Sequence, residues 1–396
     1  MHVSTVVIGL GMIGAAALRA LSESSDRGSL LGIGPAEPDD PATFAGPFAS
    51  HFDQGRITRV SDPDLIWATL ADRSIAAYDD LEQRSAVAFH HPIGHLRLGS
   101  HDERLDAAEA HARMLGAPVE RLGHAALVQR FPEVQFPPDA EAIVEDGGAG
   151  WINPRALVQA QLTIAEQHGA AIIRDAVTGL QRENGLFLVE TQAGRRIYAE
   201  RMVLSADASS IALLEQLLGR RVVLTTQAYT VVYAAIAPAQ LEQFTATPTL
   251  IWPLSEHPFL SSIYTTSATA FPDGRSYLKI GGVPHAPIFL ASPDDWRAWF
   301  HGPGRAEEIA ALQEVLQAIY PQLVVQSWAA KTCANSYTAH GAPYIAKVAD
   351  HLVLCTGGCG AAAKSSDAIG RLGAQLLLRG NWIDELPAET FQAVWA

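Results

Sequence analysis

The chain has 396 residues, of which 48% are hydrophobic and 18% charged, so it can fold into globular domains and is long enough to favour two of them. Its formal net charge of −14 repels phosphate backbones and anionic lipid, which argues against nucleic acid and membrane surfaces as partners. The chain has only three cysteines and no ligand pairs at zinc spacing, which predicts a reducing compartment and no metal site. We also find no basic N-terminal leader and no apolar run of membrane-spanning length, which predicts a cytoplasmic location.

The first expected element is a strand followed at once by a helix, within VSTVVIGLGMIGAAALRAL at residues 3–21. A β-branched run at residues 6–8, typical of a strand buried on both faces, precedes Gly9, Gly11 and Gly14. Gly9 permits a tight turn, Gly11 lets the backbone approach a pyrophosphate, and Gly14 lets helix and strand pack closely. Because the helix N-terminus also offers amide groups to a diphosphate, the pattern favours dinucleotide binding over an ordinary glycine-rich turn.

The second expected strand, SLLGIG at residues 29–34, departs from the dinucleotide pattern at its end. An acidic residue there would bond the ribose hydroxyls, but Gly34 stands in that place. Glu37 lies just beyond, in a proline-rich loop at residues 34–48. Two interpretations stay open for Glu37: a ribose ligand, or a solvated loop acid.

The remaining elements follow from local patterns. We expect a strand at 94–99, a strand, capped helix and strand within 150–172, antiparallel strands at 227–237 and 276–282, a helix at 304–320, and a strand, glycine-rich turn and helix at 354–377. Lys279 stands between Leu278 and Ile280 in one of these strands. Its side chain should therefore point away from its apolar neighbours, as a cavity-lining residue would.

Six of these segments, in the same order, resemble the flavin-dependent amine and amino-acid oxidases of the D-amino-acid-oxidase superfamily, in particular the monomeric sarcosine oxidase and N-methyltryptophan oxidase branch. The segments are a Ser-His run leading into Arg56-Ile57-Thr58-Arg59, then GHLRLG, GWINPRALVQAQLTIAEQHGAAI, YLKIGG, KTCANSYT and LCTGGCGAAAKSSDAIGRLGAQLL. The resemblance implies an α/β fold with a Rossmann-like FAD-binding domain and a second α+β substrate domain built on an antiparallel sheet. The expected FAD-binding domain comprises residues 1–85, 145–225 and 320–396, and the substrate domain comprises 86–144 and 226–319.

The resemblance implies FAD as the cofactor, attached covalently through the sulfur of Cys333. Lys331 and nearby dipoles would favour the thiolate that such a bond requires. A buried cysteine that makes no bond is the alternative. The other cofactor-binding residues implied, besides the glycines at positions 9, 11 and 14 and Glu37, are Ser50, His51, Val177 beside the adenine, and Gly358 and Gly360 in the glycine-rich turn.

The same resemblance assigns the cationic residues. Arg59 and Lys364 match the pair that binds the substrate carboxylate, and for both a surface ion pair is the alternative. Arg56 matches a cation at the flavin that stabilises the reduced ring, and Lys279 matches the lysine that promotes the reaction with oxygen. Tyr264 falls near an aromatic residue that covers the substrate, with a core tyrosine as the alternative.

The implied function is oxidation of a secondary amine or amino acid that bears a carboxylate. Hydride passes to flavin N5, the imine product is hydrolysed, and molecular oxygen is reduced to hydrogen peroxide. The partners are then a small-molecule amine and oxygen, and the protein is a monomer or small homo-oligomer. Two alternatives stay open: a flavin-dependent amino-acid dehydrogenase with another electron acceptor, and a non-catalytic protein on the same scaffold.

Several residues depart from the family pattern. Phe52 and Val283 stand where relatives have histidines, and Asn335 replaces an aromatic residue near the substrate. These changes predict a substrate other than sarcosine. Asp207 stands where flavoproteins have a glycine, so it either bonds the ribose or weakens flavin binding.

Overall fold

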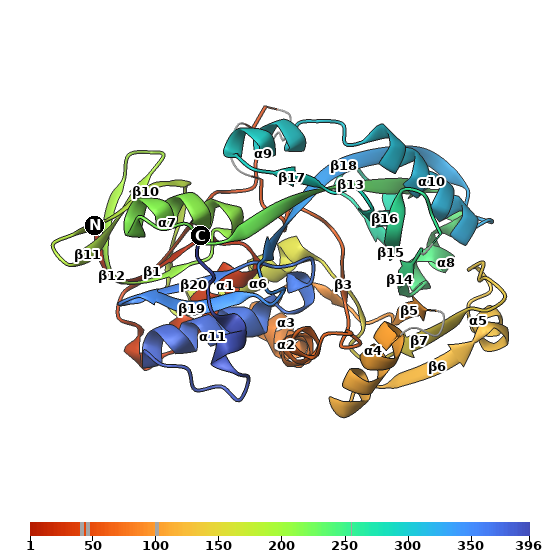
Figure 1. The fold of residues 1–396 in the computed structure, drawn as a ribbon, viewed down its shortest axis with the longest axis horizontal. Coiled ribbons are helices and arrows are strands. Elements are labelled where there is room, and N and C mark those ends of the chain that lie inside the picture. The colour runs from red at the N-terminus through yellow and green to blue at the C-terminus, as the bar shows by residue number, and fades with distance from the viewer. Residues whose placement is uncertain (40–42, 45–47, 100–102, 255) are drawn as a thin grey trace.

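The computed structural model describes residues 1–39, 43–44, 48–99, 103–254 and 256–396. Within this part of the chain, two large sheets organise the molecule (Figure 1). The eight-stranded sheet lies on the left of Figure 1 together with both chain ends, and the nine-stranded sheet lies on the right. The expected α/β fold with a second, sheet-based unit is confirmed.

The strands of the eight-stranded sheet run in the order β10 (Val177–Glu183), β11 (Leu186–Thr191), β12 (Arg196–Leu204), β1 (His2–Ile8), β2 (Leu30–Gly34) and β9 (Ala171–Arg174), with β20 (Leu352–Thr356) beside the second half of β12 and β19 (Tyr344–Ala349) beside β20. The pairs among β12, β1, β2, β9 and β20 are parallel, and the pairs β10–β11, β11–β12 and β19–β20 are antiparallel. This is the doubly wound arrangement that the N-terminal glycine pattern predicts.

Alternation along β1 explains why this sheet is buried on both faces. Val7 packs into the core beneath helices α1 (Met12–Ser22), α6 (Pro154–Gln167) and α11 (Ser366–Arg379). Val6 and Ile8 pack into the core on the opposite face, which α7 (Ser210–Leu218) covers. Successive strand residues point to opposite faces, so an unbroken β-branched run fits a central strand and would leave apolar side chains exposed at an edge.

The nine-stranded sheet is mostly antiparallel, with one parallel pair between β14 and β5. Its strands run in the order β17 (Ile288–Leu290), β13 (Leu224–Ile236), β16 (Ser276–Pro284), β15 (Leu260–Ala270), β14 (Thr249–Pro253), β5 (His95–Gly99), β7 (Glu141–Glu145) and β6 (Val119–Gly123), and β18 (Val325–Thr338) also pairs with β13. Helices α4 (Glu103–Met114), α5 (His124–Arg130), α8 (Leu241–Ala246), α9 (Pro293–Phe300) and α10 (Ala306–Ile319) accompany it.

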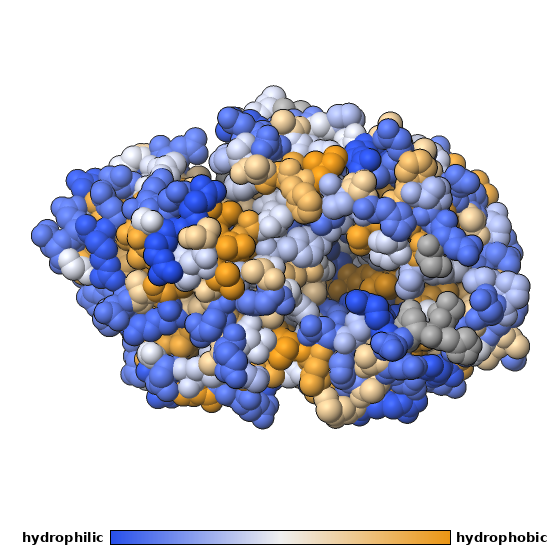
Figure 2. Space-filling view, in the orientation of Figure 1, coloured by the Kyte–Doolittle hydropathy of each residue, from blue (hydrophilic) through white to orange (hydrophobic). Residues whose placement is uncertain are grey.

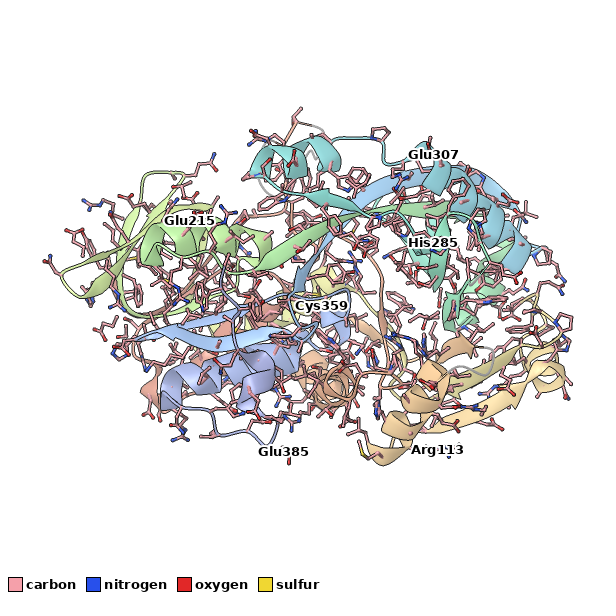
Figure 3. All side chains as sticks on the ribbon, viewed as in Figure 1. Arg113, Glu215, His285, Glu307, Cys359 and Glu385 are labelled. Carbon is pink, nitrogen blue, oxygen red and sulfur yellow. The ribbon has the colours of Figure 1, made fainter. Side chains whose placement is uncertain are left out.

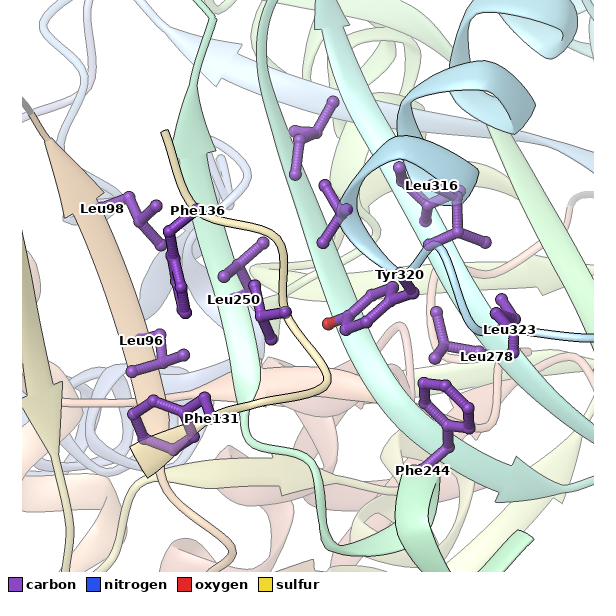
Figure 4. Close-up of a cluster of buried hydrophobic side chains, with 14 of the residues drawn as sticks. Leu96, Leu98, Phe131, Phe136, Phe244, Leu250, Leu278, Leu316, Tyr320 and Leu323 are labelled. Carbon is purple, nitrogen blue, oxygen red and sulfur yellow. The ribbon is translucent and has the colours of Figure 1, made fainter. Parts of the chain in front are cut away.

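One face of this sheet carries an apolar core, shown in Figure 4. Leu96 and Leu98 of β5, Leu250 of β14 and Leu278 of β16 meet Leu316 of α10 there. Each fully buried leucine contributes about 1.5–3 kcal/mol. This core therefore fixes the sheet so that the residues between these leucines point to the other face.

A small sheet of three strands lies between the two large ones. It consists of β3 (Arg56–Thr58), β8 (Gly150–Ile152) and β4 (His90–His91), followed by helices α2 (Leu65–Ile75) and α3 (Tyr78–Ser85) in the surrounding chain. Arg56 pairs with Ile152 in the register of β3 and β8. This pairing brings the Arg56 segment to the junction of the two large sheets.

Most expected elements lie where the sequence predicts them, but the expected domain boundary at residue 320 divides the chain differently from the sheets. Strand β18 belongs to the nine-stranded sheet because it pairs along almost its whole length with β13. Among the described residues, no helix has the length and apolar character needed to span a membrane.

Candidate active site at the junction of the sheets

The turn between β1 and α1 forms an open cradle lined by backbone. Gly9 has φ +90°, and an added Cβ would lie 2.3 Å from the carbonyl oxygen of Ser205. A Cβ on Gly14 would lie 1.7 Å from the oxygen of Gly9, so both positions require glycine. Above Gly11 the nearest atom to an added Cβ is His51 Nδ1 at 3.7 Å. No side chain caps α1, so the cradle suits the phosphates of a dinucleotide.

A cavity of about 120 Å³ continues from this cradle. Its lining includes Gly11, Ser50, Asp207, Asn335, Ser336, Thr356, Gly358 and Gly360. Asp207 has φ +47°, a left-handed conformation that costs a non-glycine residue roughly 1 kcal/mol. Its place at the cavity wall keeps both interpretations of Asp207 open.

Close contact with the β1–α1 turn explains why β2 ends in a glycine, Gly34. A Cβ on Gly34 would lie 2.8 Å from the backbone nitrogen of Leu10, so the turn itself fills the space of the missing acid. Glu37 forms an ion pair with Arg155 of α6 at 2.5 Å. Val177 begins β10 close to Gly34, whose carbonyl oxygen accepts a hydrogen bond from the Asp175 amide at 3.1 Å.

Three charged side chains meet where β3 faces β16. Lys279 Nζ lies 2.6 Å from Asp53 Oδ2, and Arg56 Nε lies 3.2 Å from the same oxygen. Lys279 also donates to the carbonyl oxygen of Gly55 at 2.7 Å, and the Tyr233 hydroxyl donates to Asp53 Oδ1 at 3.2 Å. We call Lys279, Asp53 and Arg56 the ionic triad.

Burial disfavours the charged form of each residue in the ionic triad. Burial raises the pKa of Asp53, but Lys279 and Arg56 lower it further, so this carboxyl titrates well below its usual range. Burial lowers the pKa of Lys279, and Asp53 reverses only part of that effect. The Lys279 amine therefore loses its proton more easily than an ordinary lysine, and Asp53 is what keeps it charged.

A larger cavity of about 810 Å³ opens beside the ionic triad. In Figure 2 this face of the molecule is hollowed to the right of centre, between the nine-stranded sheet and α4. Its wall includes the arginines Arg56, Arg59, Arg97 and Arg104, the tyrosines Tyr229, Tyr264 and Tyr337, and Asp62, Cys333 and Asn335. Four arginines in one cavity of an acidic protein indicate an anionic ligand.

Tyr264 lies across the sheet at the centre of this cavity. It pairs with Gly281 in the register of β15 and β16. A Cβ on Gly281 would lie 2.5 Å from the Tyr264 ring, so the glycine makes room for the ring. Lys279 Nζ lies 5.6 Å from the ring centre. The tyrosine thus lies between β16 and the cavity close to Lys279, while Arg56 of the ionic triad lines the cavity itself.

Arg59 and Lys364 share the carboxylate of Asp62. Arg59 lies 3.1 Å and Lys364 Nζ 3.3 Å from Asp62 Oδ2. Burial raises the pKa of Asp62, but Lys364 and then Arg59 lower it to about 2. Lys364 is buried and also donates to the Trp67 carbonyl at 2.9 Å.

Glu145 holds the backbone that carries these groups. Its two carboxylate oxygens accept hydrogen bonds from the Val60 and Ser61 amides, each at 2.7 Å, and its side chain is buried. The segment between Arg59 and Asp62 is therefore fixed to β7, which orients both side chains.

The model of the family described as FAD dependent oxidoreductase (DAO) matches residues 4–376. The chain belongs to this family. Comparison with curated proteins gave no match.

Solved structures of two oxidases and a dehydrogenase share the fold along almost the whole chain. NikD, an unusual amino acid oxidase essential for nikkomycin biosynthesis, is 19% identical, with a TM-score of 0.79, over 100% of this chain and 98% of NikD. L-proline dehydrogenase from P. horikoshii is 18% identical, with a TM-score of 0.75, over 98% of this chain and 96% of that one. Glycine oxidase from Geobacillus kaustophilus is 17% identical, with a TM-score of 0.70, over 99% of this chain and 98% of that one. The resemblance to the superfamily is confirmed, and the sarcosine oxidase branch stays a prediction.

The two cavities adjoin each other, because Arg56, Asn335 and Gly360 line both of them. The cradle at Gly11 fits the diphosphate, and Gly358, Gly360 and Asn335 line the space that leads on toward Cys333. Cys359 lies near the middle of the molecule, in the turn between the two glycines (Figure 3). The residues present therefore fit FAD.

Cys333 lies on β18 at the wall of the larger cavity. The Arg56 guanidinium donates to its sulfur at 3.7 Å, and the Trp299 indole donates to its carbonyl oxygen at 2.9 Å. Lys331, the expected source of positive charge, instead places Nζ 5.9 Å from the centre of the Tyr233 ring. Arg56 is thus the cation that contacts the thiol, a relation hidden in the sequence because the two residues are 277 positions apart.

The structure brings Arg56, Arg59, Lys279, Tyr264 and Cys333 together around one cavity or directly behind its wall. It does not bring Lys364 to the cavity wall, because Asp62 stands between its amine and the open space. Sequence patterns alone did not point to three residues of this region: Asp53, Asp62 and Arg97. Arg97 stands between Leu96 and Leu98 as Lys279 stands between Leu278 and Ile280, so the same alternation could have found it.

Proposed function

We propose that the protein is an FAD-dependent oxidase of a secondary amine or amino acid that bears a carboxylate. The observation that carries the proposal is the ionic triad, buried beside an arginine-lined cavity in a fold that binds FAD. FAD, when bound, accepts a hydride from the carbon next to the amine nitrogen and passes the electrons to oxygen.

The residues of the chain then have separate tasks. Arg56 and Lys279 supply fixed positive charge beside the flavin, which stabilises negative charge as electrons arrive. Tyr264 covers the substrate, and the arginines of the larger cavity orient its acid group. No acid–base side chain is required when the amine binds as the neutral base, since its lone pair then assists departure of the hydride.

We further propose that the sulfur of Cys333 holds the flavin covalently. Its place on the cavity wall and the contact with Arg56 support this role. In wild-type protein, yellow colour should survive acid precipitation. In Cys333→Ser, the colour should stay in the supernatant. Colour that leaves the wild-type precipitate would contradict covalent attachment but leave the oxidase proposal standing.

A dehydrogenase is the second candidate, and one observation favours it. Two of the three N–H donors of Lys279 are already used by Asp53 and Gly55, which limits how far the amine can serve oxygen. Hydrogen peroxide release from a panel of N-methyl and cyclic amino acids distinguishes the two. Turnover with an artificial dye but no peroxide would assign a dehydrogenase, and a colourless, inactive protein would assign a non-catalytic role.

We also propose where the enzyme is located and what kind of molecule it binds. The three cysteines are all free, which supports a reducing cytoplasmic location, and the cavity suits a small molecule.

A further inference from the structure

A buried carboxylate, Asp53, contacts both cations of the ionic triad. Its Oδ2 atom lies 2.6 Å from Lys279 Nζ and 3.2 Å from Arg56 Nε. Its Oδ1 atom accepts hydrogen bonds from the Gln54 amide at 2.8 Å and from the Tyr233 hydroxyl at 3.2 Å. Both oxygens are therefore held, and Oδ2 is fixed where it meets the two cations.

Lys279 depends on this carboxylate for its charge. The amine is 2% exposed, and a buried ammonium without a charged partner gives up its proton readily. Its other acceptor, the Gly55 carbonyl oxygen at 2.7 Å, is a dipole and carries no net charge. Burial lowers the pKa of Lys279, Asp53 raises it, and Arg56 lowers it again. The charged state of the amine is therefore maintained by Asp53.

Arg56 makes Lys279 the weaker of the two cations. Both nitrogens contact the same oxygen, so the two positive charges lie within about 6 Å of each other and repel once that carboxylate is removed. Arginine stays protonated in proteins, whereas a buried lysine loses its proton readily. Loss of Asp53 should therefore discharge Lys279 and leave Arg56 charged.

The other groups around the amine come from three neighbouring strands. Tyr233 of β13 is opposite Lys279 in the strand register, and the Tyr264 ring of β15 has its centre 5.6 Å from Nζ. Burial raises the pKa of both hydroxyls, so both stay neutral. On β18, Cys333 favours the charged amine when it is a thiolate, and Lys331 lies 5.9 Å from the centre of the Tyr233 ring. A Cys333 sulfur bonded to the flavin carries no charge, which leaves Asp53 as the fixed negative charge beside the amine.

We propose that Asp53 is a positioning residue of the flavin site, which holds Lys279 as a charged ammonium so that the positive charge beside the flavin stays constant through the neutral pH range. Lys279 acts from behind the wall of the larger cavity, which Arg56 lines. Without Asp53 this charge would vary with pH. The inference rests on the proposed function, because the charge serves electron transfer at the same flavin.

Sulfite tests the inference without turnover, because it binds oxidised flavin, removes its yellow absorbance and binds more tightly when positive charge lies beside the ring. The dissociation constant is measured at pH 6 and pH 8.5 for wild type, Lys279→Met, Asp53→Asn and the double variant. In the wild-type background, Lys279→Met should weaken sulfite binding on the order of 10-fold at both pH values. In the Asp53→Asn background, the same substitution should change the affinity by less than about 2-fold at pH 8.5, since the amine is already neutral. Each comparison is made at one pH, so the titration of sulfite itself cancels.

Tyr233→Phe is the matched control. It removes the hydrogen bond to Asp53 Oδ1 and keeps all three charges, so the effect of Lys279→Met should stay intact in this background at pH 8.5. The inference is overturned if Lys279→Met still weakens sulfite binding 10-fold in Asp53→Asn at pH 8.5, or if it has no effect in the wild-type background. If Asp53→Asn fails to fold, the wild-type background still decides, because an effect that fades between pH 6 and pH 8.5 would show that Asp53 does not hold the charge.

Failure of the proposed function gives a different result. A colourless protein overturns the oxidase proposal and this inference with it. A yellow protein that responds to sulfite as expected but releases no peroxide with any amine overturns the oxidase proposal and leaves the role of Asp53 standing. A yellow protein that produces peroxide but fails the sulfite test overturns the role of Asp53 alone.

Discussion

At the scale of single residues, Lys279 illustrates how burial and pairing compete. The amine is 2% exposed and held by Asp53 and Gly55. Removing one partner of a buried ion pair costs about 3–5 kcal/mol when the other charge is left alone. Here Arg56 remains beside Asp53, so the loss of Lys279 leaves the carboxylate partly compensated. Lys279 can therefore be replaced with a smaller effect on folding than burial alone suggests.

Lys279→Met should slow oxygen consumption by the reduced enzyme on the order of 10²-fold, because it removes a fixed positive charge where negative charge develops. Reduction of the enzyme by substrate should change less. Stopped-flow absorbance measures the two half-reactions separately. Lys331→Met is the matched control, since this exposed lysine of β18 lies over the ring of Tyr233. An unchanged rate with oxygen in Lys279→Met would remove Lys279 from the oxygen reaction.

At the scale of elements, strand β5 shows how one sheet face becomes polar and buried. His95 and Arg97 alternate with two core leucines. His95 Nδ1 lies 2.9 Å from the Thr249 hydroxyl, and its ring is fully buried. Burial first, and then Arg59, Arg97 and Lys364, lower the pKa of His95 well below its ordinary value. The imidazole stays neutral among cations.

This shift makes stability depend on pH in a definite direction. As pH falls below about 6.5, the unfolded chain protonates at His95 while the folded chain does not. Unfolding is thereby favoured, by up to about 1.4 kcal/mol per pH unit. Urea unfolding at pH 7.5 and 5.5 should show that His95→Asn loses less stability between these pH values than wild type does. Equal losses in the two proteins would contradict a neutral buried His95.

The elements themselves were largely predictable, because each rests on a local pattern. The glycine turn at 9–14, the capped helix after Asn153 and the helix at 306–319 all carry their signals within a few residues. The pairing of β18 with β13 was missed, because it joins segments about 100 positions apart, and no local signal assigns β18 to one sheet or the other.

At the scale of the whole molecule, the site depends on contacts that no local pattern reveals. The sequence predicts Arg56, Arg59 and Lys279 as cations of the site, but Asp53 and Lys279 are 226 positions apart. Nothing in the chain order indicates that Asp53 neutralises that amine, or that Asp62 joins Arg59 to Lys364. Charge compensation between distant segments decides which cation is available to a ligand, and it follows only from the folded structure.

The proposed position of the flavin between the two sheets leads to a prediction for global stability. The cradle at Gly11 belongs to the eight-stranded sheet, whereas Cys333 and Tyr264 belong to the nine-stranded one. A ligand that contacts both units only in the folded state stabilises it by about 2.7 kcal/mol at a hundredfold excess over its Kd. The Cys333→Ser protein, whose flavin can be removed, should therefore unfold a few degrees lower when stripped than when reloaded with FAD. Calorimetry of the two forms, at matched protein concentration, measures the difference. Identical melting temperatures would show that the flavin does not bridge the sheets, because a cofactor held by both units cannot leave their joint stability unchanged.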